Sequence, residues 1–217
     1  MIKKLLKVFI ILLAIASKGN AQTCLHSDLS KKFDYKIIRT DQKDFGGTAS
    51  KIIIEIYNKG NKKLFQRLQF TSTGYGLSNT FRVCTNEKSF VTGQNLKGDI
   101  SDEDYGDIVV ADLNFDGKED FAVKHNIPAD TGPQYWYFIQ GKKGFKKDEY
   151  LSKRMPFFPW LIKSQKHQLI SMVSPHAGTH IYQFQYNTTS KKWKKIGERF
   201  VYHDEGLDKI LARLKNN

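Results

Sequence analysis

The chain carries the stretch Asp112-Leu113-Asn114-Phe115-Asp116-Gly117-Lys118-Glu119-Asp120 between two short apolar runs. Residues 107–111 precede it and residues 121–124 follow it, and both runs are rich in the β-branched and aromatic residues that favour strands. Gly117 permits the sharp backbone turn that such a short connection needs. The stretch therefore predicts a polar loop that joins two β-strands.

Oxygen-bearing side chains recur at alternate positions of this loop. Calcium takes six to eight oxygen ligands, and alternate residues of a tightly curled loop direct their oxygens toward one centre. Positions 1, 3, 5 and 9 carry such side chains, and the carbonyl at position 7 can complete the set. We therefore expect calcium as cofactor, with the metal ligands Asp112, Asn114, Asp116, Lys118 (backbone) and Asp120.

The loop differs from an ordinary EF-hand. An EF-hand has a bidentate Glu at position 12 and helices on both sides, whereas this loop has Val123 at position 12 and predicted strands as neighbours. It is EF-hand-like in a β setting. The alternative is an Asp/Asn/Gly-rich hairpin turn that binds nothing.

Further strands are predicted on both sides of the loop. Residues 51–57 and 63–70 alternate apolar and polar side chains around the turn at 58–61, which is typical of a hairpin. Other expected strands are 35–39, 82–85, 135–140, 169–173, 181–186 and 193–201, and residues 207–214 have helical spacing. The predicted fold class is mainly β, with antiparallel sheets in a compact sandwich or propeller-like arrangement and a short C-terminal helix. No period repeats three times, so matching propeller blades are not supported.

The N-terminus has the pattern of an export signal. Lysines precede an apolar run from Val8 to Ala16, and small residues follow, which predicts a signal peptide at residues 1–21 and one β domain at residues 22–217. Cys24 close behind the run also fits a lipoprotein, although Thr23 stands where such signals usually carry Gly, Ala or Ser. We expect a periplasmic or secreted protein without a transmembrane segment in the mature chain.

Charge and cysteines describe the expected mature chain. The signal contains four lysines and no acid, so residues 22–217 have 31 basic and 22 acidic side chains, for a net charge of +9. Cys24 and Cys84 allow one intramolecular disulfide, which an oxidising compartment favours. A free Cys84 in a core strand is the alternative.

Several other groups of residues fit more than one role. His176 and His180 are spaced for zinc on a helix, with His203 or Asp204 as a third ligand, but Gly178 favours an exposed loop. His125 fits packing better than ligation. Residues 155–160 form either an aromatic binding lip or a lid on the core. Lys191–Lys195 is a basic turn; in an exported chain it does not indicate nucleic acid.

The stretch from Asp112 to Tyr186 resembles known calcium-loop proteins. Its loop is similar to those of FG-GAP and VCBS repeats and, more narrowly, to a family of small exported bacterial proteins with one such loop. The shared pattern continues through Gln134–Tyr137, Gly144-Phe145, Leu151, Pro156 and a final hairpin. One member is an immunity protein that inhibits a lysozyme-like effector of a type IV secretion system.

The resemblance implies a binding or inhibitor protein directed at a cell-wall hydrolase or another envelope protein. The loop at 174–180 has the placement of an inhibitory loop, but its histidines depart from that pattern, and a charge of +9 would repel a basic lysozyme. No nucleophile–base pattern is present, and the acidic run 102–104 fits a turn better than a glycosidase pair. We expect no enzyme activity. A structural envelope protein that uses calcium only for stability, or an unrecognised hydrolase, are the alternatives.

Overall fold

The computed structural model describes residues 21–44, 47–74, 84–96, 104–128, 132–174, 178–202 and 206–216. Within these residues the strands form three sheets, which we name the first, middle and third sheet. The first sheet contains β1 (Ala21–His26), β2 (Phe33–Asp44), β3 (Gly47–Asn58) and β4 (Leu64–Ser72). The middle sheet contains β5 (Glu87–Ser89), β6 (Ile108–Ala111), β7 (Asp120–Asn126), β8 (Gln134–Gly141) and β9 (Gly144–Lys147). The third sheet contains β10 (Pro159–Lys163), β11 (Gln168–Val173), β12 (Gly178–Asn187) and β13 (Lys192–Tyr202).

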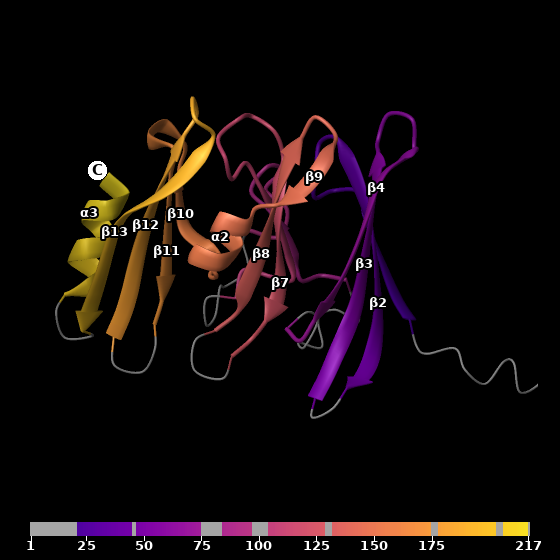
Figure 1. Cartoon of the computed structure of the whole chain (residues 1–217), viewed down its shortest axis with the longest axis horizontal. Coiled ribbons are helices and arrows are strands. Elements are labelled where there is room, and N and C mark those ends of the chain that lie inside the picture. The colour runs from indigo at the N-terminus through magenta and orange to yellow at the C-terminus, as the bar shows by residue number, and fades with distance from the viewer. Residues whose placement is uncertain are drawn as a thin grey trace, which may run out of the picture.

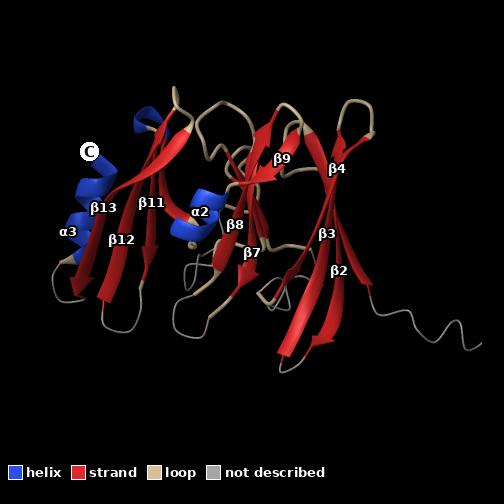
Figure 2. Ribbon diagram, viewed as in Figure 1, coloured by secondary structure: helices blue, strands red, loops and turns tan. Residues whose placement is uncertain are grey.

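The sheets lie face to face in chain order, from the indigo first sheet to the yellow C-terminal end (Figure 1). Neighbouring strands pair antiparallel throughout the described strands, except that β5 and β6 are parallel. Two helices occupy the described part of the chain, α2 (Glu149–Arg154) and α3 (Leu207–Asn216), beside a short 3-10 turn at Ser164–Lys166 (Figure 2). The predicted mainly β fold with a short C-terminal helix is therefore confirmed.

The first sheet buries one face and exposes the other. Along β3, Ile52, Ile54 and Ile56 are buried while the residues between them are partly exposed. This period of two follows from the pleat, which directs successive side chains to opposite faces. The buried isoleucines pack against Ile108 and Phe121 of the middle sheet.

The middle sheet is buried on both faces. Ile108 and Val110 of β6 pack against the first sheet, whereas Val109 and Ala111 pack toward the third. A strand covered on both sides has to be apolar at every position, and all four residues of β6 are buried. This arrangement explains why the sequence at 108–111 is continuously apolar and does not alternate.

The third sheet is covered on its far side by α3. Leu169 and Phe184 contribute to the core shared with the middle sheet, while Ile170, Ile181 and Val201 face the helix. The side chains that α3 places against this face are Leu207, Ile210, Leu211 and Leu214, the residues whose spacing predicted the helix. None of the helices in the described part of the chain is long and apolar enough to cross a membrane.

Most expected strands are present, with one clear error. Arg82 and Val83 lie outside the described residues, but Cys84 has a left-handed backbone (φ 53°) and Thr85 is in no strand, so a strand at 82–85 was a wrong prediction. The cysteine occupies a turn instead, and pairing resumes at β5. Sequence analysis also missed β1, β5, β9, β10 and α2, which are short and carry little periodic signal.

The predicted disulfide is present. Cys24 on β1 bonds to Cys84, with a Cα–Cα distance of 5.5 Å. It links the first strand of the first sheet to the segment that enters the middle sheet. Cys84 is therefore not a free cysteine in a core strand, which was the alternative prediction.

Residues 155–160 close the core. Met155, Phe157 and Phe158 are buried, and Met155 and Phe158 pack with Tyr135 and Leu151 between the middle and third sheets. The aromatic run is therefore a lid and does not form an exposed lip.

His125 packs against an aromatic ring, as expected. Its imidazole stacks on Trp136 with centroids 4.4 Å apart and planes 8° from parallel, and Lys147 Nζ lies 4.3 Å from the centroid of the same indole. Burial, with a smaller contribution from the Lys147 charge, lowers the pKa of His125 from 6.5 to about 4.

This depressed pKa predicts an acid-sensitive fold. The unfolded chain takes up a proton on His125 near pH 6.5 and the folded chain only near pH 4, so stability falls as pH decreases through that window. His125→Phe keeps the stacked ring and removes the titration. Urea unfolding at several pH values within the window is expected to give a shallower loss of stability for the variant; equal slopes for both proteins would contradict the assignment.

Candidate metal centre in the β6–β7 loop

The loop begins after Ala111, where β6 ends, and returns to the sheet at Asp120, where β7 begins. Two residues in it have left-handed backbone conformations, Phe115 with φ 60° and Gly117 with φ 75°. These reversals curl the chain within nine residues. The predicted loop between two strands is confirmed in its position.

Side-chain oxygens of the first half of the loop converge on its backbone amides. Asp112 Oδ1 and Asn114 Oδ1 both accept a hydrogen bond from the Asp116 N–H at 3.1 Å, and Asp112 Oδ2 accepts one from the Gly117 N–H at 3.0 Å. Each of these oxygens keeps a further lone pair. Two oxygens that share one donor are close neighbours, as ligands of one calcium ion must be, since these are separated by at most about 5 Å.

Lys118 supplies a positive charge at the loop. Its Nζ lies 2.7 Å from Asp116 Oδ2. The hydrogen bond to Asp116 raises the pKa of the Lys118 amine, and the charges of Asp116, Asp120 and Asp112 add to the effect. The Lys118 ammonium therefore interacts with the negative charges of all three expected carboxylate ligands, Asp112, Asp116 and Asp120.

Asp120 lies in the interior. Its Oδ2 accepts hydrogen bonds from the N–H groups of Leu113 (3.0 Å) and Asn114 (3.2 Å), and its Oδ1 accepts one from Gln140 N–H on β8 (2.8 Å). The side chain is fully buried. The pKa of this carboxyl is raised to about 7, because burial and, to a smaller extent, the charge of Asp116 outweigh the three amide hydrogen bonds that lower it.

Contacts in two further directions anchor the loop. Phe115 packs against His167 and Trp193 of the third-sheet region, with centroids 5.4 and 6.2 Å apart. In the opposite direction, Glu119 accepts hydrogen bonds from Ser30 Oγ and from Lys31 N–H (2.8 Å) in the turn between β1 and β2. Sequence analysis did not identify Phe115 or Glu119 as functional, because neither lies at a ligand position of the loop.

The donor set fits calcium in its chemistry. Asp112, Asn114 and Asp116 offer hard oxygens from one short curled segment, and the Lys118 carbonyl belongs to the same segment. Among the described residues, the three loop aspartates do not bring their carboxylate oxygens within 4.8 Å of one another; that proximity is found for Cys24, His26 and Glu87. Asp116 is exposed and Asp112 partly exposed, whereas Asn114 and Asp120 are buried, so the candidate centre opens to solvent at Asp112 and Asp116.

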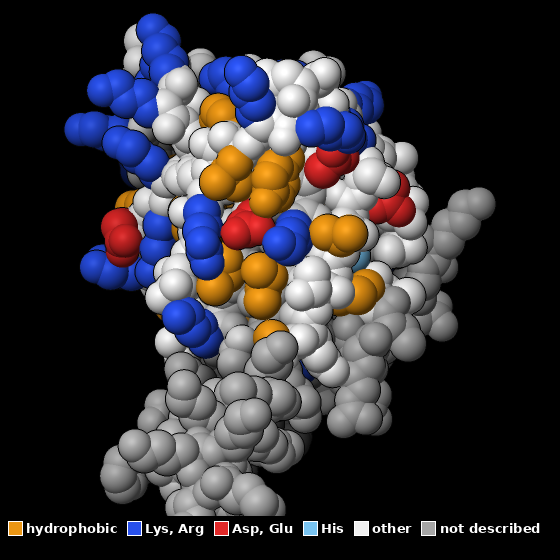
Figure 3. Space-filling model, turned by 90° about the vertical axis from the view of Figure 1, so that its right-hand side faces the viewer, with side chains coloured by type: hydrophobic (Ala, Val, Ile, Leu, Met, Phe, Trp, Pro, Cys, Tyr) orange, Lys and Arg blue, Asp and Glu red, His pale blue; other side chains and the backbone are white. Residues whose placement is uncertain are grey.

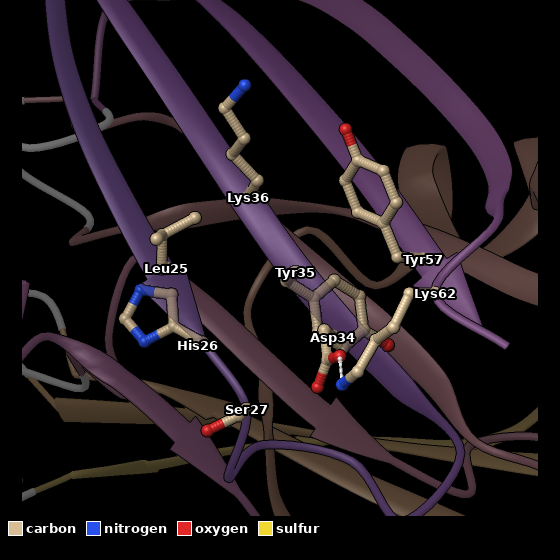
Figure 4. A pocket seen from close by; sticks show the side chains of 8 residues that line it. All are labelled: Leu25, His26, Ser27, Asp34, Tyr35, Lys36, Tyr57 and Lys62. Atoms are coloured by element: carbon tan, nitrogen blue, oxygen red, sulfur yellow. Dashed lines mark hydrogen bonds and ion pairs between the residues drawn. The ribbon is translucent and has the colours of Figure 1, made fainter. Parts of the chain in front are cut away.

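A cavity of about 470 Å³ opens on the first sheet, at the β1–β2 turn that Glu119 contacts. Leu25 and His26 lie on one side of it and Tyr57 and Lys62 on the other, with the ion pair of Asp34 and Lys62 (2.7 Å) between them (Figure 4). The outward face of this sheet mixes hydrophobic side chains with Lys and Arg around a few acids (Figure 3). Leu25 at the cavity is 74% exposed.

The other expected groups take structural positions or lie outside the described residues. His176, His203 and Asp204 belong to the undescribed part, as do residues 102 and 103. His180 lies on β12 and stacks on Tyr182. Asp104 pairs with the buried Lys124 at 2.8 Å, and Asp107 contacts the same ammonium at 3.0 Å. The prediction of a basic turn at 191–195 was wrong for most of its length: only Lys191 lies in the turn, and residues 192–195 begin β13, with Trp193 buried and the lysines exposed.

Comparisons with known proteins add no relative. No family model, no curated protein and no solved structure matches the chain.

The hydrogen bonds of Asp120 predict a large stability effect. Asp120→Asn keeps the size but replaces one acceptor oxygen by an NH2 group that faces N–H donors. Hydrogen bonds to a charged group contribute roughly 1.5–3 kcal/mol each, so we expect a loss of about 2 kcal/mol. Denaturant unfolding in chelator measures this loss without metal. Asp116→Asn at the exposed side is the matched control, with an expected change within about 0.5 kcal/mol; equal effects would show that Asp120 is not the anchor.

Proposed function

We propose that this chain is an exported, non-enzymatic binding protein that one calcium ion in the β6–β7 loop stabilises, and that it inhibits a cell-wall hydrolase. The proposal of a calcium ion is based on the oxygen donors of the β6–β7 loop described above. The class of partner rests on the resemblance of residues 112–186 to the exported calcium-loop family. The binding surface that we assign is the cavity on the first sheet.

One contact carries the proposal, the hydrogen bonds from Ser30 and Lys31 to Glu119. Glu119 is the residue next to Asp120, so a metal that orders the loop also orders this carboxylate. Ser30 Oγ in turn accepts hydrogen bonds from Lys32 N–H (2.9 Å) and Phe33 N–H (2.8 Å), which fixes the β1–β2 turn. That turn connects Ser27 and Asp34 of the cavity wall. Calcium would thus stabilise the β1–β2 turn and, through it, the wall of the cavity that we assign as the binding surface.

The cavity has the features of a protein-binding surface. An exposed apolar side chain, Leu25, lies beside an aromatic one, Tyr57, and charged groups surround them. Interfaces combine such an apolar centre with a polar rim. The net charge of +9 expected for residues 22–217 favours a partner with an acidic surface, because opposite charge speeds encounter.

Calcium titration of the purified protein tests the metal. Asp116→Asn removes one charged ligand and should weaken calcium binding roughly tenfold or more. Lys118→Gln removes the ammonium that competes for Asp116 and should tighten binding roughly two- to five-fold, the range of an exposed ion pair. Isothermal calorimetry measures both. If the wild type shows no saturable calcium binding, or if neither variant differs from it, the loop is only a turn.

Inhibition of muramidase turnover tests the partner. We expect the protein to inhibit a hydrolase with an acidic surface and a chelator to relieve the inhibition. Glu119→Gln should leave calcium affinity unchanged but weaken inhibition roughly fivefold or more, because it uncouples the loop from the cavity wall. Glu149→Gln, on the exposed surface of α2, is the matched control. Calcium binding without inhibition of any hydrolase would favour the structural envelope protein, and turnover of cell wall by the protein itself would favour the hydrolase.

A further inference from the structure

Cys24, His26 and Glu87 gather in the interior between the first and middle sheets. One ligand atom from each, the sulfur, a ring nitrogen and a carboxylate oxygen, lies within 4.8 Å of the other two. His26 Nε2 and Glu87 Oε2 are 3.5 Å apart. Cys24 and His26 share a face of β1 because they are two positions apart in a strand.

Three polar side-chain atoms of His26 and Glu87 have no hydrogen-bond partner among the described residues. Glu87 is 0% exposed and His26 7% exposed. Within the described part of the chain, neither carboxylate oxygen of Glu87 has a hydrogen-bond partner, nor does Nε2 of His26. Burial of an unsatisfied carboxylate is costly, and a cation is one way to satisfy it. The geometry therefore provides a buried carboxylate and an imidazole directed at a common point beside a sulfur.

The sulfur is held in the disulfide with Cys84. A dithiol or a phosphine that supplies two electrons, together with two protons, converts the disulfide into two thiols. Zn²⁺ can then displace both thiol protons and bind two thiolates. Reduction would thus turn this cluster into four donors, from Cys24-Leu25-His26 and Cys84-Thr85-Asn86-Glu87.

This donor set is that of a zinc site. Zinc favours four ligands among Cys, His and carboxylate, at bond lengths of 2.0–2.3 Å in tetrahedral geometry, which separates the ligand atoms by about 3.3–3.8 Å. The His26–Glu87 distance of 3.5 Å already lies in this range. The site differs from the β6–β7 loop, whose donors are all oxygen and suit a hard cation.

We propose that zinc and the Cys24–Cys84 disulfide are alternative occupants of this position: the reduced chain binds one Zn²⁺ through Cys24, Cys84, His26 and Glu87. A disulfide oxidant, which takes up two electrons and two protons to become a dithiol, re-forms the Cys24–Cys84 bond and releases the zinc. Both occupants join the first sheet to the segment that enters the middle sheet. The chain would keep this connection before and after the disulfide forms. The inference is independent of the calcium loop and of the proposed partner.

Zinc binding to the chain from residue 22 to residue 217, reduced with a phosphine, tests this proposal. Competition with a chromophoric chelator in excess calcium should give one Zn²⁺ per reduced chain and none for the oxidised chain. His26→Gln and Glu87→Gln should each weaken binding roughly tenfold or more. Glu55→Gln, a carboxylate on the outward face of the first sheet, is the matched control and should bind as the wild type does. Cobalt in place of zinc should give thiolate charge-transfer and tetrahedral d–d absorption.

Reduction removes the Cys24–Cys84 link, so circular dichroism and thermal unfolding accompany the titration to follow the fold. Because metal binding to a folded site stabilises it, zinc should raise the melting temperature of the reduced wild type more than that of Cys24→Ser or Glu87→Gln. Equal zinc affinity in the reduced wild type and both His26 and Glu87 variants would assign binding to the thiols alone and overturn the site. A reduced chain that zinc neither binds nor stabilises would overturn it as well.

Discussion

The middle sheet has no free face, and the whole arrangement depends on this constraint. Because β6 and β7 are covered on both sides, the loop that joins their ends lies where the middle sheet meets its neighbours. The β6–β7 loop contacts both neighbours at once. Asp120 accepts hydrogen bonds from amides of its own loop and of β8. Glu119 accepts one from an amide of the turn between β1 and β2, and Phe115 packs toward the third sheet. The loop is the place where contacts to all neighbouring layers meet.

Two candidate metal positions lie on the junction between the first and middle sheets, with opposite chemistry. The loop presents hard oxygens near the surface, while Cys24, His26 and Glu87 present sulfur, nitrogen and oxygen in the interior. Each joins segments that are far apart in sequence, Ser30 to Glu119 in one case and Cys24 to Cys84 in the other. Both links therefore close a long segment of the chain, and the contacts at each link offset part of the conformational entropy that this closure costs.

The local sequence pattern predicted the strands and the helix that bury one face. Period-two alternation located β3 and β4, and helical spacing located α3, because each of these elements buries one face. Short strands such as β5 and β9 and the six-residue helix α2 escaped, since three to six residues carry too little periodicity. Cys84 was assigned to a strand, but its backbone is left-handed and it lies in a turn before β5. The signal peptide lies outside the described residues and stays a prediction.

The sequence by itself determined the mainly β class and the position of the loop, because spacing and composition along the chain suffice for each; it allowed a Cys24–Cys84 disulfide, which the structure then showed. The tertiary structure alone decided that Asp120 points inward, that Glu119 supports a distant turn and that Glu87 meets His26. Asp120 meets Gln140 on the neighbouring strand β8, Glu119 is 89 residues from Ser30, and Glu87 belongs to a strand that follows the whole first sheet. No local sequence pattern predicts these side-chain contacts, because the pairing of strands and the stacking of sheets bring the residues together.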